Sequence, residues 1–169
     1  MTLDSTVGGA SADSYATLAE YQAYSTSMGW TLTALHVDQE AHLRRAAMVN
    51  DAGFNWLGYR VTSDQARQWP RSVSVNVDGF AVPSDSIPAA IKTAQMEMAY
   101  LIQQGTDPVA AVDGRTITSE RKKVDVIETE TEYSEGYAQA YYPAIDRLVM
   151  PYATGKLGQR AGSVPIMRA

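Results

Sequence analysis

The residues that could do chemistry in this chain are few, and their spacing assembles no recognisable reactive site. His36 and His42 flank two acidic residues, Asp38 and Glu40, and such a group could suggest a metal site. Positions six apart point to different faces of a helix, and Asp38 is better explained as a helix cap. The 169 residues include no cysteine, which excludes thiolate ligands, thiol nucleophiles and disulfides. We therefore predict no metal site and no cofactor.

The serine and carboxylate side chains supply no catalytic motif either. No Gly-x-Ser-x-Gly occurs, and Gly8-Gly9 is not followed by the Gly-Lys-Ser/Thr of a phosphate loop. The alternating Glu128, Glu130 and Glu132 could supply a carboxylate pair, but a solvated strand face explains them better. We predict no catalytic residue and a protein that is not an enzyme. An enzyme with an unrecognised carboxylate site is the least favoured alternative.

Charge is distributed unevenly along the chain. The net charge is −5, from 19 acidic and 14 basic side chains, whereas proteins that neutralise phosphates usually carry a basic surplus. Residues 125–135 are strongly acidic, and only basic charges follow Asp146. Tyrosines at 137–142 lie beside the acidic stretch, which favours a protein interface over base stacking. With neither a signal sequence nor a membrane-spanning run, we expect a soluble chain made in the cytoplasm.

The spacing of apolar residues predicts a mainly α fold, a small bundle of about four to five helices. Thr17 and Glu20 have the spacing of a capping box, Asp38 is expected to cap the next helix, and Pro88 fits the first turn of the clearest helix. Trp69-Pro70 is expected to end a short helix. The predicted helices cover residues 17–29, 38–53, 63–68, 87–105 and 143–150.

The other segments are predicted to be extended or irregular. Residues 1–14 are small and polar and suggest an extended arm. Alternation from Lys122 to Tyr133 predicts a strand, with residues 117–119 as its hairpin partner and a turn at 120–122. The glycine-rich segment after residue 152 has no core pattern, so its deletion is expected to leave a folded bundle. The predicted organisation is a domain at 1–152, with a bundle at 14–105, a β-hairpin arm at 115–134 and a short helix at 143–150, followed by an extended C-terminal tail at 153–169.

The central segment carries a distinctive series of motifs. They are Trp56-x-Gly58-x-Arg60, Gln65-x-x-x-Trp69-Pro70-Arg71, Gly79-Phe80 and Pro83-x-Asp85-x-Ile87-Pro88. Over residues 13–152 the chain resembles a phage family often labelled DnaT-like single-stranded DNA-binding protein, whose members look like head–tail adaptors of long-tailed phages. The Trp-Pro-Arg and Pro-x-Asp-x-Ile-Pro elements, in this order, carry the resemblance.

The resemblance implies a structural virion protein of the phage neck. Such adaptors, also called head completion or connector proteins, form a dodecameric ring between the portal protein and the next neck or tail-completion protein. Double-stranded DNA passes through the ring without sequence-specific binding. We therefore expect a location at the head–tail interface of the virion, assembly in the host cytoplasm, and no membrane partner. Single-stranded DNA binding is the alternative function, supported by the family label and the aromatic residues.

The resemblance and the charges suggest residues that contact partners. C-terminal segments of these adaptors commonly dock onto the portal, and the docking residues would be Lys156, Arg160, Ile166 and Arg168. A basic and an acidic group could be complementary patches on neighbouring subunits; they are Arg121, Lys122 and Lys123, and Glu128, Glu130 and Glu132. Alternatively, the acidic group lines the channel, or it is an ordinary solvated strand face.

The central motifs are predicted to be structural. Trp69 is expected to fill the core, and Arg71 to donate hydrogen bonds to carbonyls at a helix end. The structural motif residues are Trp69, Pro70, Arg71, Asp85 and Pro88.

Overall fold

The chain folds into two compact units. The computed structural model describes residues 2–73, 76–77, 80–108, 117–123, 128–133 and 142–156. The first unit contains residues 1–108 and 142–169, and the second contains residues 109–141. In the sequence, the second unit is therefore an insertion into the first.

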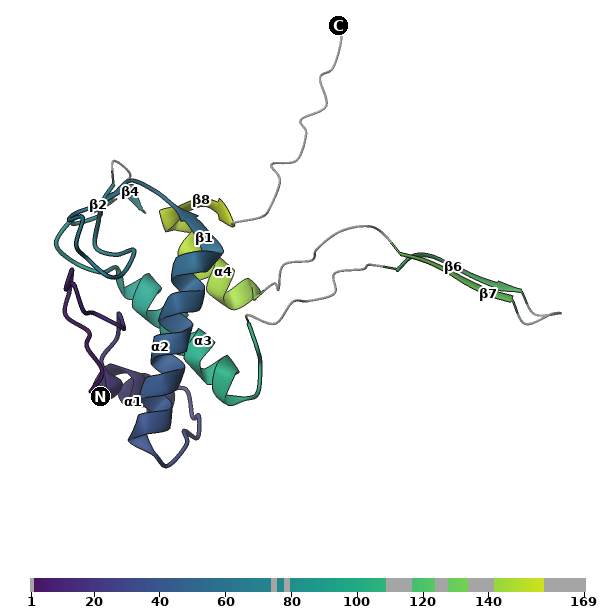
Figure 1. Cartoon of the computed structure of the whole chain (residues 1–169), viewed down its shortest axis with the longest axis horizontal. Helices are drawn as coiled ribbons and strands as arrows, with labels where there is room; N and C mark the ends of the chain where they lie inside the picture. Colours follow the sequence, from purple (N-terminus) through teal and green to yellow (C-terminus); the bar gives the residue numbers. More distant parts are fainter. Residues whose placement is uncertain are drawn as a thin grey trace, which may run out of the picture. The chain divides into compact units, whose positions relative to one another are not determined.

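Helices dominate the described part of the first unit, which confirms the predicted mainly α fold. The four α-helices are α1 (Leu18–Ser27), α2 (His36–Gly53), α3 (Ala89–Gln103) and α4 (Pro143–Val149), and a 3-10 turn, η1 (Met150–Tyr152), follows α4. α2 packs against α3, and α3 packs against α4 (Figure 1). No helix among the described residues combines the length and the apolar character needed to cross a membrane.

Short antiparallel strand pairs complete the described structure. The strands are β1 (Phe54–Trp56), β2 (Tyr59–Arg60), β3 (Arg71–Ser72), β4 (Asn76–Val77), β5 (Phe80–Ala81), β6 (Ile117–Lys123), β7 (Glu128–Tyr133) and β8 (Ala153–Lys156). They pair as β1–β8, β2–β3, β4–β5 and β6–β7. The β1–β8 pair joins the end of α2 to the segment that follows α4. It therefore brings together two parts of the first unit that are far apart in the sequence.

The core lies where α2, α3 and α4 meet. Its buried side chains recur at intervals of three, four or seven residues within each helix, because such positions share one helix face. The buried apolar residues of these helices include Leu43, Ala46, Ala47, Ile91, Ala94, Met98, Ile145 and Val149. The periodicity that predicted the helices therefore also predicted which faces are buried.

Helix starts were predicted in part. Thr17 and Glu20 form the expected capping box: the Glu20 amide donates to the Thr17 hydroxyl at 3.1 Å, and the Thr17 amide donates to the Glu20 carboxylate at 2.7 Å. The prediction that Asp38 caps α2 is wrong, because α2 begins at His36. Asp38 lies in the first turn instead, where its negative charge favours the positive end of the helix dipole. Pro88 immediately precedes α3 rather than lying within its first turn.

The predicted short helix at 63–68 is wrong, because these residues form bends. The Gln65 amide satisfies backbone groups that a helix would otherwise pair. It accepts from the Thr62 amide at 3.1 Å, and it donates to the carbonyls of Arg67 at 2.9 Å and Pro70 at 3.0 Å. A polar side chain that bonds nearby backbone in this way competes with helical hydrogen bonding.

Trp69 fills the core, as predicted, although it does not end a helix. Its indole is buried and packs edge to face against Trp56 and Tyr152, with ring centroids 5.9 and 5.7 Å apart. The Trp69–Pro70 peptide bond is cis. Asp85 is exposed at a turn before α3.

The N-terminal segment is not the extended arm that composition suggested. The amides of Asp13 and Ser14 both donate to the Asp4 carbonyl, at 2.8 and 3.0 Å, and fold the segment back on itself. Ala12 and Ser14 are buried. These residues therefore form part of the first unit and are packed against its helices.

The predicted start of an extended tail at residue 153 is also wrong. Ala153 is buried, and β8 pairs with β1. The Lys156 ammonium lies 2.5 Å from the Asp146 carboxylate and 6.0 Å from the centre of the Phe54 ring. Lys156 is only 7% exposed, so it serves the core and not the docking surface expected of it. The other three proposed docking residues, Arg160, Ile166 and Arg168, lie outside the described residues.

The second unit contains the expected hairpin with a different turn. The predicted turn at 120–122 is wrong, because these residues lie within β6, and the connection between the strands is 124–127. In the register of the pair, Arg121 lies opposite Glu130, Lys123 opposite Glu128 and Lys122 opposite Thr129, and Ser119 lies opposite Glu132. Two of the basic positions proposed to join neighbouring subunits, Arg121 and Lys123, thus lie opposite acidic positions of the same hairpin.

The buried Lys156–Asp146 pair makes a testable contribution to stability. Lys156→Met should lower the free energy of unfolding by about 3–5 kcal/mol, because the Asp146 carboxylate would stay buried without its cation. Asp146→Leu combined with Lys156→Met should recover most of this loss, since apolar replacement of both members of a buried pair is nearly neutral. Urea denaturation measures both effects.

Lys92→Met is the matched control, because Lys92 pairs with Glu20 at a partly exposed position. Such a pair contributes at most about 1 kcal/mol. Equal losses in Lys156→Met and Lys92→Met would contradict the assignment of Lys156 to the core.

Candidate functional site

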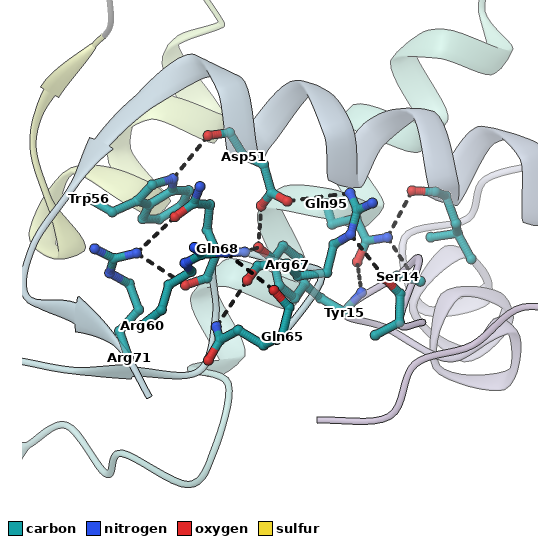
Figure 2. A network of polar contacts seen from close by, with 12 residues as sticks. Ser14, Tyr15, Asp51, Trp56, Arg60, Gln65, Arg67, Gln68, Arg71 and Gln95 are labelled. Atoms are coloured by element: carbon teal, nitrogen blue, oxygen red, sulfur yellow. Dashed lines mark hydrogen bonds and ion pairs between the residues drawn. The ribbon is translucent and has the colours of Figure 1, made fainter. Parts of the chain in front are cut away.

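A buried amide on α3 holds together three segments of the first unit. Gln95 is fully buried, and its side-chain oxygen accepts from the amides of Tyr15 and Ala16 at 3.0 and 2.9 Å. Its nitrogen donates to the Ser14 hydroxyl at 2.7 Å and to the Leu43 carbonyl on α2 at 2.9 Å (Figure 2). All four hydrogen-bonding positions of this amide are therefore used.

A second polar centre forms around Asp51, near the end of α2. Its carboxylate accepts a short hydrogen bond from the Tyr15 hydroxyl, and it lies 3.3 Å from the Arg67 guanidinium (Figure 2). The Gln68 amide donates to the same Tyr15 hydroxyl at 3.1 Å. The Asp51 carbonyl accepts from the Trp56 indole at 3.2 Å. This centre fixes the irregular segment at 57–70 to α2.

The electrostatics of this centre follow from burial. Burial raises the pKa of Asp51 to about 6, against the opposing effects of Tyr15 and Arg67. Burial, and then the neighbouring Asp51 charge, raises the pKa of Tyr15 well above its usual value. The side chains of Tyr15 and Asp51 bond each other and stabilise the fold. The raised pKa of the Asp51 carboxyl is therefore explained by its structural role.

Arg71 fixes the turn between β1 and β2. Its guanidinium donates to the carbonyls of Leu57 at 2.7 Å and Gly58 at 2.6 Å, and to the Gln68 side chain at 2.8 Å. The expectation of carbonyl acceptors is confirmed, but they lie in a turn and not at a helix end. Gly58 has a φ of +67°, and a Cβ there would lie 2.0 Å from the Ser72 carbonyl oxygen. Only glycine fits this close approach of β2 to β3.

Two short strands display aromatic side chains to solvent. Tyr59 on β2 is 81% exposed and Phe80 on β5 is 77% exposed. Arg60, next to Tyr59, is also exposed and makes one 3.3 Å hydrogen bond to the Gln65 carbonyl. Large aromatic rings usually contribute to a core or an interface, so two of them exposed to water on short strands suggest a binding surface. We call Tyr59, Arg60 and Phe80 the aromatic surface.

The spacing of the two rings is bounded by the strand pairings. Tyr59 pairs with Ser72, and Phe80 pairs with Val77. The five residues from Ser72 to Val77 span at most about 18 Å. With about 5.5 Å for each strand pairing, the Cα atoms of Tyr59 and Phe80 lie within roughly 30 Å of each other. A single extended ligand can therefore reach both rings.

The partner-contacting residues proposed from the sequence do not include Tyr59, Arg60 or Phe80. Lys156 is buried, and the charged positions of the hairpin belong to the second unit. The tyrosine cluster at 137–141 lies outside the described residues. In the part of the chain that the structure describes, no three His, Asp or Glu side chains converge as metal ligands would. Burial lowers the pKa of His42, which keeps its ring neutral over a wider pH range.

The aromatic surface was missed because nothing in its periodicity marked it. Tyr59 and Phe80 each follow a glycine, within motifs that served only to indicate the family resemblance. Aromatic residues next to glycines in a segment without apolar periodicity were the available signal, since such a segment has no core face to place them in.

Comparison with known proteins gives one positive finding. A family model described as "Putative DnaT-like ssDNA binding protein" matches residues 1–169, the full length of the chain. Neither the curated proteins nor the solved structures contain a match.

This match corrects the interpretation of function drawn from the sequence. The family is described by single-stranded DNA binding and not as a head–tail adaptor, so the identification as an adaptor and connector of the virion is wrong. The finding favours the alternative that the sequence left open. The expected dodecameric ring, portal contact and virion location are tested by neither the match nor the structure, and stay predictions.

The Gln95 amide offers a direct test of the scaffold. Gln95→Met should lower the free energy of unfolding by roughly 2–5 kcal/mol, because the two buried amides of Tyr15 and Ala16 would lose their acceptor. Gln104→Met, at an exposed position just after α3, is the matched control and should change stability by less than about 0.5 kcal/mol. Calorimetry or urea denaturation measures the stability of both variants. If Gln95→Met is as stable as wild type, the Gln95 amide does not hold the three segments together.

The raised pKa of Asp51 predicts a pH dependence of stability. A carboxyl with a pKa of about 6 in the folded state and 3.8 in the unfolded state favours folding most when protonated. Its contribution is present below pH 3.8 and is lost as the pH rises through 6, a change of about 3 kcal/mol in the limit. Between pH 4 and pH 7, wild type should therefore lose about 2–3 kcal/mol more stability than Asp51→Asn. Parallel losses in the two proteins would show that Asp51 titrates normally.

Proposed function

This chain belongs to the DnaT-like single-stranded DNA-binding protein family, and we propose that it binds single-stranded DNA by stacking bases on the aromatic surface. The observation that carries the proposal is the exposure of Tyr59 and Phe80 on two short strands, of which β2 belongs to the segment fixed by the buried polar network. Unpaired bases present flat apolar faces, and stacking on an aromatic side chain is tolerant of sequence because every base has such a face.

Arg60 supplies the charge that this surface needs. It is exposed and follows Tyr59 directly, so its guanidinium can reach a phosphate beside a stacked base. Arg67 and Arg71 lie nearby in sequence, but their guanidinium groups are engaged with Asp51 and with backbone carbonyls. They therefore position the surface rather than contact the ligand.

The net charge of −5 is compatible with this function. Net charge sums over the whole chain, whereas binding depends on the surface that meets the ligand. Stacking does not require a basic protein, so we expect affinity to arise mainly from the two rings. The charge of the whole chain and the acidic surroundings of the tyrosines at 137–142 therefore do not bear on binding at Tyr59 or Phe80.

The proposed role is binding without catalysis. Asp51 is a carboxylate with a perturbed pKa, a feature that often marks an enzyme site. Here its hydrogen bonds go to Tyr15 and Arg67, which tie the segment at 57–70 to α2. We infer that this carboxylate supports the aromatic surface and takes no part in a reaction.

Substitution of either ring tests the proposal. Tyr59→Ala and Phe80→Ala should each weaken binding to oligo(dT) by about 1–3 kcal/mol, or about 5- to 150-fold, because each removes one stacking platform. Tyr59→Phe should bind like wild type because it keeps the ring. Met28→Ala, at an exposed residue beyond α1, is the control. Fluorescence anisotropy measures the affinities.

Repeating these titrations at several salt concentrations and with duplex DNA can contradict the proposed binding by stacking. The logarithm of the binding constant should fall with the logarithm of salt concentration with a slope near −0.7, as expected for about one phosphate contact. Duplex DNA should bind more weakly because its bases are already stacked in pairs. A steep salt slope with full binding by both alanine variants would place the DNA on another surface, and no binding at low salt would reject DNA binding altogether.

A further inference from the structure

The outer face of α2 carries apolar side chains that the first unit leaves in water. Val37 and Met48 are each 61% exposed, and Ala41 between them is also exposed. At about 100° per residue, the three positions fall within about 40° of each other around the helix axis. They form a narrow apolar stripe along α2, on the side opposite the face that packs on α3.

Opposite charges flank this stripe on one side. Asp38 and Arg45 are both exposed, and they lie about 100° and 80° around the axis from Val37, so they share one edge of the stripe. They are seven residues apart, which places them about 10 Å from each other along the helix. The acidic residue is nearer the start of α2 and the basic residue is nearer its end.

This arrangement is complementary to itself. If two copies of α2 pack antiparallel about a two-fold axis, the edge with the charges falls on the same side of both helices, and the order along the axis is reversed. With the axis near residue 42, Asp38 of each copy meets Arg45 of the other, and Val37 meets Met48. Ala41 lies close to the axis, where a small side chain allows the helices to approach. We propose that the outer face of α2 binds a second copy of this chain.

The intrachain partner of Arg45 does not oppose this assembly. Arg45 pairs with Asp107, and both side chains are about half exposed, so the pair contributes little to stability. A guanidinium carries five N–H donors, so Arg45 can also donate hydrogen bonds to a second carboxylate. Arg44 lies at the other edge of the stripe and already bonds Asp13 and Glu40 within the same copy.

The area of the outer face of α2 limits the expected affinity of the dimer. A standard interface buries about 800 Å² on each partner, and one face of an 18-residue helix buries less than that. The dimer should therefore be weak, with a dissociation constant in the micromolar range or above, and should form only at high protein concentration. It uses α2 and not the aromatic surface, so DNA binding and dimerisation can fail separately.

Charge reversal is the sharpest test. In sedimentation velocity over a concentration series, Asp38→Arg alone and Arg45→Asp alone should each raise the dimer dissociation constant by about tenfold or more, because like charges would meet. The protein with both substitutions should return to within about threefold of wild type. Asp85→Arg, at an exposed acidic residue away from α2, should leave dimerisation unchanged. Circular dichroism checks that each variant is folded.

Single cysteines test the geometry, since the chain contains none of its own. Ala41→Cys should form a cross-linked dimer with a short bismaleimide, whereas Thr26→Cys, exposed on α1, should not. Met48→Glu should abolish the cross-link when combined with Ala41→Cys, while Met150→Glu, an equivalent change at an exposed residue elsewhere, should preserve it. A wild-type protein that stays monomeric at millimolar concentration, or a charge-reversed pair that fails to recover, would overturn the proposal.

Discussion

The first unit depends on the burial of one side-chain amide. Gln95 sits among apolar neighbours on α3, where an unpaired amide would cost several kcal/mol. Its four hydrogen bonds join the N-terminal segment, α2 and α3, and they fix the direction in which the chain enters α1. The apolar faces of the helices supply the driving force for packing, and Gln95 selects one arrangement among those that apolar contact alone would allow.

A second polar group extends this order to a segment that has little regular structure. Between β1 and β3 the chain has no long helix or strand. The side chains of Gln65 and Arg71 bond its backbone groups instead, and the Asp51 carboxylate pairs with Arg67. Their cooperation explains how a stretch of bends can be rigid. It also explains how Tyr59 can stay in water, because the segment that carries it is held by polar side chains and does not need the ring for a core.

The sequence predicted features that depend on near neighbours along the chain. The Thr17–Glu20 capping box and the buried face that includes Ile91 and Ala94 follow from spacing alone. Features that depend on distant partners were not predictable. Gln95 and Lys156 look like ordinary surface residues until Ser14 and Asp146 are brought beside them, about 80 and 10 positions away. The binding surface was hidden for the same reason, since its exposure reflects what the rest of the chain already buries.

In the proposed function, the exposed rings of Tyr59 on β2 and Phe80 on β5 receive unpaired bases. The most direct measurement is a two-dimensional amide NMR titration of the labelled protein with oligo(dT). We expect the largest changes in amide chemical shift at Tyr59, Arg60, Phe80 and Ala81, with small changes on α1 and α2. Shifts confined to the second unit or to the C-terminal residues, with none at these four amides, would contradict it.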